Sequence, residues 1–402
     1  MTKWSKLFNK YHWIIVPIII FLITRGLISI GGYIGRVAFL EMVDNSVPWI
    51  SHPHMLPVDI WDRWDGGFYR GIARGGYVFN PADGSSNVAF FPMYPILIRA
   101  VGTFIPDLTI AGMIVSHVLL LGGMIFLYKL AMLEFDNQDT AKKTIFYLSI
   151  FPTAFYFGAV YTESTFLLFS VATIYFTRKH KWAWAGIAAM FASTTRVVGI
   201  LLYIFMMLEW LTVHKDDLHD MLHSNHRFRA IINRQSIGEL LLIHLSLLGL
   251  LLYMLYLYLQ FGDPLAFFHA QSTWGKNVLG FPLSALWRDF SAIFRQNFLK
   301  GDTYMWRVSI DAIAGVFVLL LIIPIWRKLN ANYALFALLN LLVPITTGST
   351  QSLSRYALSI FPIFFVLAIW GENEYVDMII TVGSLVLLAV LFTVFANWGF
   401  VA

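Results

Sequence analysis

The chain has 402 residues, of which 58% are hydrophobic and only 13% are charged. Soluble domains carry about 25% charged residues, so the composition excludes a soluble globular protein and indicates a polytopic integral membrane protein. Cysteine is absent, which excludes disulfide bonds, and the formal net charge of +5 fits basic cytoplasmic loops better than nucleic-acid binding.

Apolar segments along the chain are candidates for membrane-spanning helices, which need about 17–25 apolar residues. The first follows three lysines, and its length and lack of a cleavage site predict a retained helix rather than a removed signal peptide. The segments at 183–195 and 197–211 also fit one helix kinked at Arg196. We therefore predict an all-α fold of about eleven transmembrane helices, at 13–34, 109–131, 144–160, 162–177, 183–195, 197–211, 237–260, 308–326, 333–347, 356–371 and 375–396.

Basic residues gather in short loops on the side of the N-terminus, which the positive-inside rule places in the cytoplasm. These loops contain Lys142–Lys143, Arg178–Lys181, residues 215–234 and Arg327–Lys328. Segments 35–108 and 261–307 then form two long extracytoplasmic loops of one integral membrane domain, residues 1–402. Within the first loop, residues 90–102 are too short and too proline-broken to span, and their aromatic residues predict a segment at the membrane interface.

The densest polar chemistry of the chain, "WDRWDGGFYRGIARGGY" at 61–77, lies in this first loop. In a helix, Asp62 and Asp65 would lie on neighbouring surface. A solvated interface helix explains these charges, but so does catalysis. A glycosidase needs two carboxyl groups, whereas sugar transfer from a lipid phosphate needs one base, because the leaving phosphate is already a stable anion. Such a transferase also needs positive groups to hold the phosphate and aromatic faces to pack against the sugar, and this stretch of sequence offers both.

Several motifs in order along the chain carry a resemblance to a known family. They are "RWDGGFYRGIARGGY" with "NVAFFPMYPILIRAVG", then "FPTAFYFGAVYTES", "STTRVVGI", "GDPLAFFHAQSTWG" and "SRYALSIFP". Together they resemble the signature of the GPI mannosyltransferase II (PIG-V-like) family. Such proteins are similar to GT-C glycosyltransferases, which take sugars from polyprenyl phosphates on the non-cytoplasmic face and carry a catalytic aspartate in the first outer loop.

The resemblance implies that Asp65, the aspartate of the Trp-Asp pair, is the catalytic base. The family has no second acid at a fixed position there, so Asp62 is a supporting acid only. Trp64 and Tyr69 are expected to contact the sugar. Eukaryotic relatives often have a histidine a few residues after the pair, where this chain has "GGF" at 66–68, so a GPI precursor is not implied as acceptor.

Two arginines are expected to hold the donor phosphate. Arg196 and Arg355 fall at outer ends of predicted spans and within the matching motifs, and a guanidinium fork suits a phosphate group. Tyr356 accompanies Arg355. Snorkelling or a structural ion pair would explain the same arginines. Arg25, inside the first helix, is expected to be a buried structural partner.

The remaining outer motifs offer further polar groups. Glu163 fits three roles: it could order Arg196, accept a sugar hydroxyl or cap a helix. Gln271 and Trp274, three residues apart, can present an amide and an indole to a substrate. His269 is expected to be an ordinary polar residue of the loop.

No metal or other cofactor is expected. The histidines with helical spacing lie in the basic cytoplasmic loop, and the sequence has no D-x-D or H-E-x-x-H pattern. The histidines are His214, His219, His223 and His226.

These observations predict a glycosyltransferase of the GT-C type in a bacterial plasma membrane, with a cytoplasmic N-terminus and an extracytoplasmic active site. It would move a sugar, by resemblance mannose, with inversion from a polyprenyl-phosphate-linked donor to a glycan, glycolipid or protein. A transporter or flippase of lipid-linked sugars is an alternative, but it predicts charges deep in the spans and paired broken helices. A non-catalytic scaffold is a third possibility, which the acid and both arginines disfavour.

Overall fold

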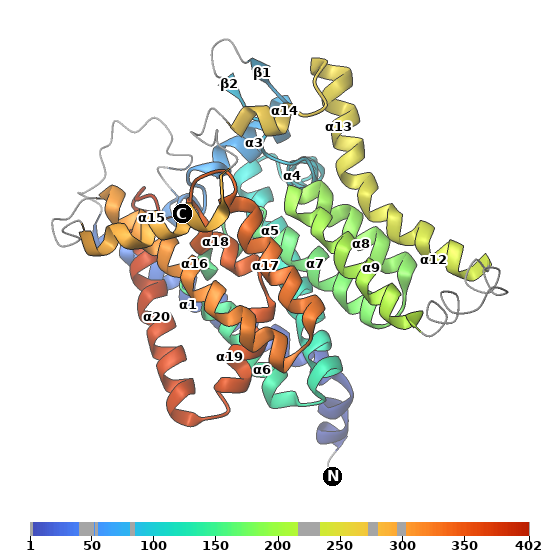
Figure 1. Cartoon of the computed structure of the whole chain (residues 1–402). Coiled ribbons are helices and arrows are strands. Elements are labelled where there is room, and N and C mark those ends of the chain that lie inside the picture. The colour runs from blue at the N-terminus through green and yellow to red at the C-terminus, as the bar shows by residue number, and fades with distance from the viewer. Residues whose placement is uncertain are drawn as a thin grey trace.

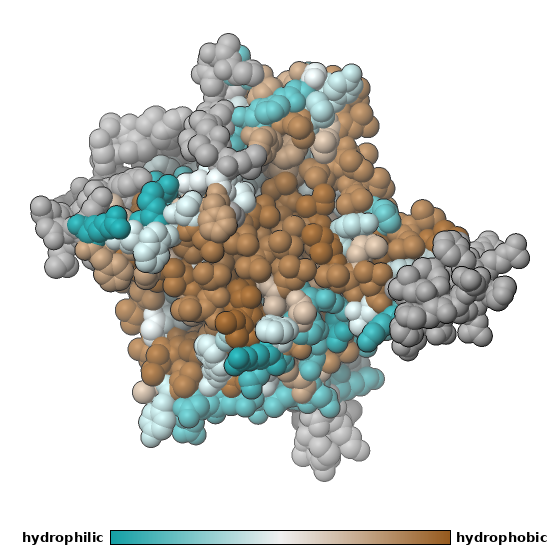
Figure 2. All heavy atoms as spheres, in the orientation of Figure 1, coloured by the Kyte–Doolittle hydropathy of each residue, from teal (hydrophilic) through white to brown (hydrophobic). Residues whose placement is uncertain are grey.

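Helices make up nearly all of the secondary structure in the computed structural model, which describes residues 3–39, 52, 55–80, 85–215, 234–271, 280–295 and 303–401. The strands among these residues form one short antiparallel hairpin, in which β1 (Phe79–Asn80) pairs with β2 (Ser85–Ser86). The prediction of an all-α polytopic membrane protein is confirmed. A broad hydrophobic belt separates two polar ends of the molecule (Figure 2), as an integral membrane protein requires.

Five helical segments among the described residues are long and apolar enough to cross a membrane: Lys10–Ala38, Leu108–Phe135, Gln235–Phe261, Met305–Lys328 and Glu374–Ala396. They belong to α1 (Lys3–Ala38), α5 (Leu108–Phe135), the run of α12 (Arg234–His244), η4 (Leu245–Leu247) and α13 (Leu248–Phe261), α16 (Thr303–Lys328) and α20 (Glu374–Ala396). A sixth is possible as a bent pair, Leu353–Ser359 with Pro362–Trp370, which turns by 83°. The predicted number of about eleven full crossings is therefore not confirmed.

Most of the other predicted spans are shorter helices: α6 (Gln138–Ile150), α7 (Glu163–Arg178), α8 (Trp182–Thr195), α9 (Leu201–Val213) and α17 (Ala331–Ile345). The span predicted at 144–160 is wrong, because α6 ends before Pro152 and the chain continues through the 3-10 helix η2 (Ala154–Phe157). A residue that precedes proline disfavours the helical conformation. Arg196 has an extended backbone and separates α8 from η3 (Val197–Ile200) and α9, so this pair is two helices.

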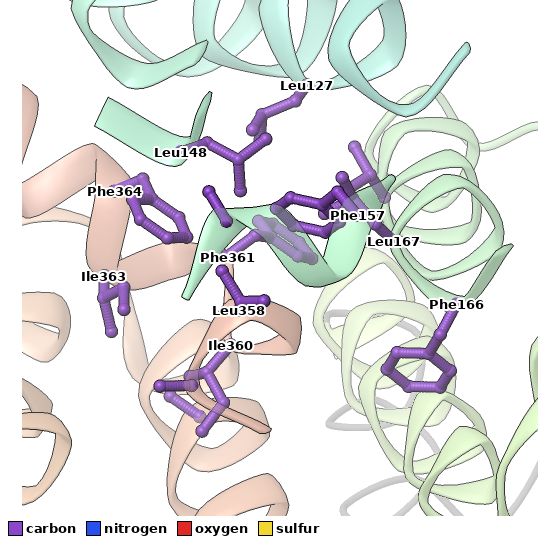
Figure 3. Packing of buried hydrophobic residues seen from close by; sticks show 14 of the residues in the cluster. Leu127, Leu148, Phe157, Phe166, Leu167, Leu358, Ile360, Phe361, Ile363 and Phe364 are labelled. Atoms are coloured by element: carbon purple, nitrogen blue, oxygen red, sulfur yellow. The ribbon is translucent and has the colours of Figure 1, made fainter. Parts of the chain in front are cut away.

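Helices both near and distant in sequence pack closely in the core. α5 packs against α7, which packs against α8, while α1 lies against α20 and α19 (Pro362–Trp370) against α6. Figure 3 shows Leu148 and Phe157 facing Leu358, Phe361 and Phe364, all of which are buried. This contact fixes η7 (Ala357–Ser359), which links α19 to the short helix α18 (Leu353–Tyr356).

The first long loop is folded rather than extended. It contains α2 (Leu56–Asp59), α3 (Asp65–Gly75) and α4 (Met93–Gly102), and α4 corresponds to the predicted interface segment. These elements lie at one end of the bundle beside α14 (Ala266–His269), opposite the N-terminus (Figure 1). In the second loop, the amphipathic helix α15 (Pro282–Arg295) packs on α16 and α17.

Candidate active site

A cavity of about 550 Å³ lies at the end of the bundle that holds α3 and α14. Its walls come from α3, the turn between α8 and η3, the region of α14, α17, and α18 with η7. Six of the predicted site residues line it together: Asp65, Tyr69, Arg196, Gln271, Arg355 and Tyr356. The chain thus brings into one cavity side chains that are separated by up to about 290 positions in sequence.

Asp65 is the first residue of α3, so its carboxylate projects from the start of the helix. Its backbone N–H donates to the hydroxyl of Tyr161 at 3.2 Å. Its Oδ2 accepts a hydrogen bond from Nη1 of Arg355 at 2.6 Å, while Oδ1 accepts none from the described residues. The carboxylate is therefore fixed on one side and open on the other.

Arg355 is buried among three aromatic rings and is paired with two acids. Its guanidinium carbon lies 5.1 Å from the ring centre of Tyr161 and 5.4 Å from that of Tyr356, and Nε lies 3.5 Å from Oε1 of Glu163. Aromatic faces stabilise a desolvated guanidinium. Two carboxylates and three aromatic rings therefore together stabilise this cation in the protein interior.

The backbone that carries Arg355 is held by Asp311 on α16. One carboxylate oxygen accepts from the N–H of Ser352 and the other from the N–H and hydroxyl of Ser354, at 2.7–2.9 Å. Ser352 has a positive φ of 73°, a conformation that costs energy for a non-glycine residue. Asp311 offsets this cost and fixes the turn before Arg355.

Arg196 is the second cation of the cavity. Nε donates to Oγ1 of Thr162 at 2.9 Å, Nη1 donates to Oγ of Ser359 at 3.1 Å, and Nη2 donates to Oε1 of Glu163. Its guanidinium carbon lies 5.4 Å from the ring of Tyr356, which therefore lies beside both arginines.

Glu163 pairs with both arginines. Its side chain has no exposed surface, so among the three roles predicted for it the structure supports the ordering of Arg196. Burial excludes direct contact with a sugar in this conformation. The two arginines, Glu163 and Asp65 carry equal numbers of positive and negative charges.

Tyr69 lines the cavity beside Asp65, and its hydroxyl lies 3.5 Å from Oγ1 of Thr162. Burial, together with the negative charge of Asp65, raises the pKa of the Tyr69 hydroxyl well above its ordinary value. The phenol is therefore neutral at physiological pH and is a poor candidate for a base.

Some predicted site residues lie elsewhere. Asp62 is 2% exposed and does not line the cavity. It accepts from Oγ1 of Thr109 at 2.9 Å and pairs with Nε of Arg70 at 2.7 Å, so it ties α3 to α5. Trp64 is not among the lining residues either, because its ring packs edge-on against Trp398 and Phe400.

The remaining predictions concern Trp274, the histidines and Arg25. Trp274 lies outside the described residues, as do His219, His223 and His226. His269 lines the cavity and pairs with Asp263 of the same loop at 2.6 Å. Arg25 donates to the carbonyl groups of Ser149 and Ala154, in the structural role predicted for it.

Sequence reasoning missed several residues that build the site. Thr162 and Ser359 hold Arg196, Asp311 holds the turn before Arg355, and Asn340 lines the cavity from α17. A signal was present for Asp311, since a carboxylate inside a predicted span is costly without a partner.

A carboxylate and two arginines around one cavity of a membrane protein fit the class of membrane-embedded enzymes. Residues 58–286 match the family described as Mannosyltransferase (PIG-V). The match covers more than half of the chain and includes Asp65, Glu163 and Arg196, whereas Arg355 lies beyond it. The chain belongs to the mannosyltransferase (PIG-V) family.

Two solved structures are similar to this chain at 12% sequence identity. One is the Archaeoglobus fulgidus oligosaccharyltransferase in complex with Zn and sulfate, with a TM-score of 0.41; the match covers 85% of this chain and 48% of that one. The other is the archaeal oligosaccharyltransferase AglB from Archaeoglobus fulgidus in complex with an inhibitory peptide and a dolichol-phosphate, with a TM-score of 0.43 and coverage of 97% and 56%. The chain spans about half the length of these proteins. A search of the curated proteins finds no match.

Proposed function

We propose that this protein is a GT-C-type glycosyltransferase that transfers mannose from a polyprenyl-phosphate-linked donor to an acceptor hydroxyl, with inversion at the anomeric carbon. Membership of the mannosyltransferase family supports the reaction class. The observation that carries the proposal is the position of Asp65, whose Oδ1 is unbonded by the described residues and lies in the same cavity as Arg196 and Arg355.

In this reaction Asp65 accepts the proton of the acceptor hydroxyl as that oxygen forms a bond to the anomeric carbon. The bond between that carbon and the phosphate oxygen breaks, and its electron pair leaves with the phosphate. Attack on the face opposite the leaving group gives inversion. A carboxylate that is positioned by one oxygen and open at the other suits this role, because a general base must be both oriented and accessible.

The arginines stabilise the charge that develops on the departing phosphate. The donor carries one negative charge and the released lipid phosphate carries a second, so a preorganised cation is most useful in the transition state. Arg355 contacts Asp65 directly. A phosphate bound to Arg355 would weaken that contact and leave Asp65 more basic at the moment when it must accept a proton.

The proposal also includes the membrane in which the enzyme lies and its orientation there. The protein is an integral membrane protein, and we place its single domain in a bacterial plasma membrane with the cavity on the extracytoplasmic side. Basic residues support this orientation, because Lys142 lies near the start of α6, and Arg178 and Arg327 lie in the last turns of α7 and α16. The acceptor would be an extracytoplasmic glycan, glycolipid or protein.

The test uses purified full-length protein and a panel of polyprenyl-phosphate monosaccharides, with release of free polyprenyl phosphate as the readout. Release with the mannosyl donor, dependent on an added acceptor, is the expected result. Movement of the sugar-lipid across vesicle membranes without any release would instead identify a transporter and overturn the proposal.

A further inference from the structure

Asn340 is a buried polar residue in the cavity wall whose side-chain oxygen has no protein partner among the described residues. It is 3% exposed and lies on α17, and its Oδ1 accepts no hydrogen bond there. Asparagine in a membrane helix commonly bonds to a neighbouring helix. Here Nδ2 donates to the carbonyl of Phe336 on the same helix, at 2.9 Å. The amide therefore does not tie α17 to another helix.

A second acceptor belongs to the same residue. The backbone carbonyl of Asn340 would normally accept from the N–H four residues later, but that residue is Pro344, which has no N–H. Both residues line the cavity together with Val343 of the same helix and with Thr346 and Thr347, which follow its last residue. One turn of α17 thus carries two oxygens that the helix itself does not satisfy.

The hydroxyl groups on this wall extend the pattern. Oγ1 of Thr346 donates to the carbonyl of Val343 at 2.6 Å, and Oγ1 of Thr347 donates to that of Pro344 at 2.8 Å. Their hydrogen atoms are used at the C-terminal end of α17, so they can offer only lone pairs to a ligand. Apart from the second N–H of Asn340 Nδ2, the polar groups that α17 and the turn after it add to the cavity are therefore acceptors, whereas Arg196 and Arg355 contribute only donors.

A ligand that satisfies both walls must accept hydrogen bonds at one part and donate them at another. A phosphate group accepts from arginine, and sugar hydroxyl groups donate to carbonyl oxygens. We infer that Asn340 binds a hydroxyl group of the sugar on the donor and so discriminates a glycosylated lipid phosphate from the bare lipid phosphate. This inference rests on the proposed function and adds the residue that recognises the sugar.

The experiment compares two ligands of equal chain length, mannosyl-phosphoryl polyprenol and polyprenyl phosphate, without acceptor. Their affinities are measured for the full-length protein and for Asn340→Leu, which keeps the size of the side chain and removes its acceptor. Affinity for the mannosyl lipid should fall about tenfold, the effect of one hydrogen bond to a buried group. Affinity for polyprenyl phosphate should change less than about twofold. Val343→Ala is the matched control, because it alters the same wall without removing a polar group.

Thermal stability supplies a second readout. Asn340→Leu removes one hydrogen bond within α17, from Nδ2 to the carbonyl of Phe336, and removes a buried oxygen that no described residue satisfies, so it should melt at about the same temperature as the unchanged protein or higher. A lower melting temperature, or equal weakening of both ligands, would assign Asn340 a structural role and overturn the inference. Unchanged affinity for both would also overturn it, since water would then satisfy the oxygen equally well. If the unchanged protein binds and turns over no sugar-lipid at all, the proposed function fails first.

Discussion

Two arginine clusters lie at the two ends of α7 and differ in how completely their acids are satisfied. Glu163, at the first residue of the helix, pairs with Arg196 and Arg355 in the cavity. Arg178, at the last residue and about 22 Å away along a helix axis that rises 1.5 Å per residue, pairs with Glu134 at 2.7 Å and Glu209 at 2.5 Å.

All four carboxylate oxygens of the Arg178 cluster have partners. Besides the arginine, Glu134 accepts from the hydroxyl of Tyr333 at 3.0 Å, and Glu209 accepts from Nδ2 of Asn332 at 3.2 Å. In the cavity cluster, Oδ1 of Asp65 and Oε2 of Glu163 accept no hydrogen bond from the described residues. A saturated cluster joins helices, whereas an unsaturated one beside a cavity can exchange partners with a ligand.

The comparison predicts that Asp65→Asn has the largest effect on turnover. The amide keeps the shape of the side chain but cannot accept the acceptor proton, so turnover should fall about 10²- to 10⁴-fold. Donor binding should be retained, because both arginines remain. Release of polyprenyl phosphate measures the first quantity and binding of labelled donor the second. Near-normal turnover would remove Asp65 as the base.

Asp62→Asn is the matched control for that variant. Asp62 is buried and bonded to Thr109 and Arg70 away from the cavity. Its loss should lower the free energy of unfolding by about 1–3 kcal/mol and leave turnover per folded molecule unchanged. A selective loss of turnover in this control would move the proposed chemistry from Asp65 to Asp62.

Arg355→Lys should weaken donor binding about tenfold or more. Lysine keeps the charge but loses the planar fork that holds phosphate and carboxylate together, and a hydrogen bond to a charged group is worth about 1.5–3 kcal/mol. The KM for the donor should rise while the melting temperature changes little. Unchanged KM with a lower melting temperature would make Arg355 a structural residue like Arg178.

The same substitution at Arg178 should have the opposite signature. Arg178→Lys removes part of a saturated and mostly buried network, which should lower the free energy of unfolding by about 1–3 kcal/mol. The donor KM and the turnover of the folded fraction should stay unchanged, because Arg178 does not line the cavity. Thermal unfolding and donor kinetics on the same samples separate the two outcomes.

The part of the fold that could be predicted from the sequence is the part that hydrophobic patterning determines. Apolar runs located the helices of the bundle, because burying or embedding such segments dominates their energetics, but not the loop helices α3, α14 and α15. The predicted helix boundaries were wrong where the backbone breaks or bends: α6 ends before Pro152, and the α18–α19 region bends by 83°. The number of full crossings depends on helix length and bending, which hydropathy does not determine.

The site residues that could be predicted are those that lie in a recognisable motif, in a loop or at the end of a predicted helix. Asp65, Arg196 and Arg355 come from such motifs and line one cavity. The sequence did not predict that Asp62 would be tied to Thr109, since i,i+3 spacing brings the two aspartates near each other without saying which one faces a cavity. Nor did it identify Asn340, because an unsatisfied acceptor appears only when the neighbouring helices are in place.

The smallest expected effect is that of metal removal. No group of three or more His, Cys, Asp or Glu side chains that could hold a metal ion occurs among the residues described by the structure. The stronger argument comes from the proposed function: the leaving group would be a phosphate, and Arg196 and Arg355 would supply positive charge where its second negative charge develops. We expect EDTA to change turnover by less than about twofold. Loss of turnover that Mg²⁺ or Mn²⁺ restores would mean that the arginines do not suffice and that a metal ion supplies further positive charge in the cavity.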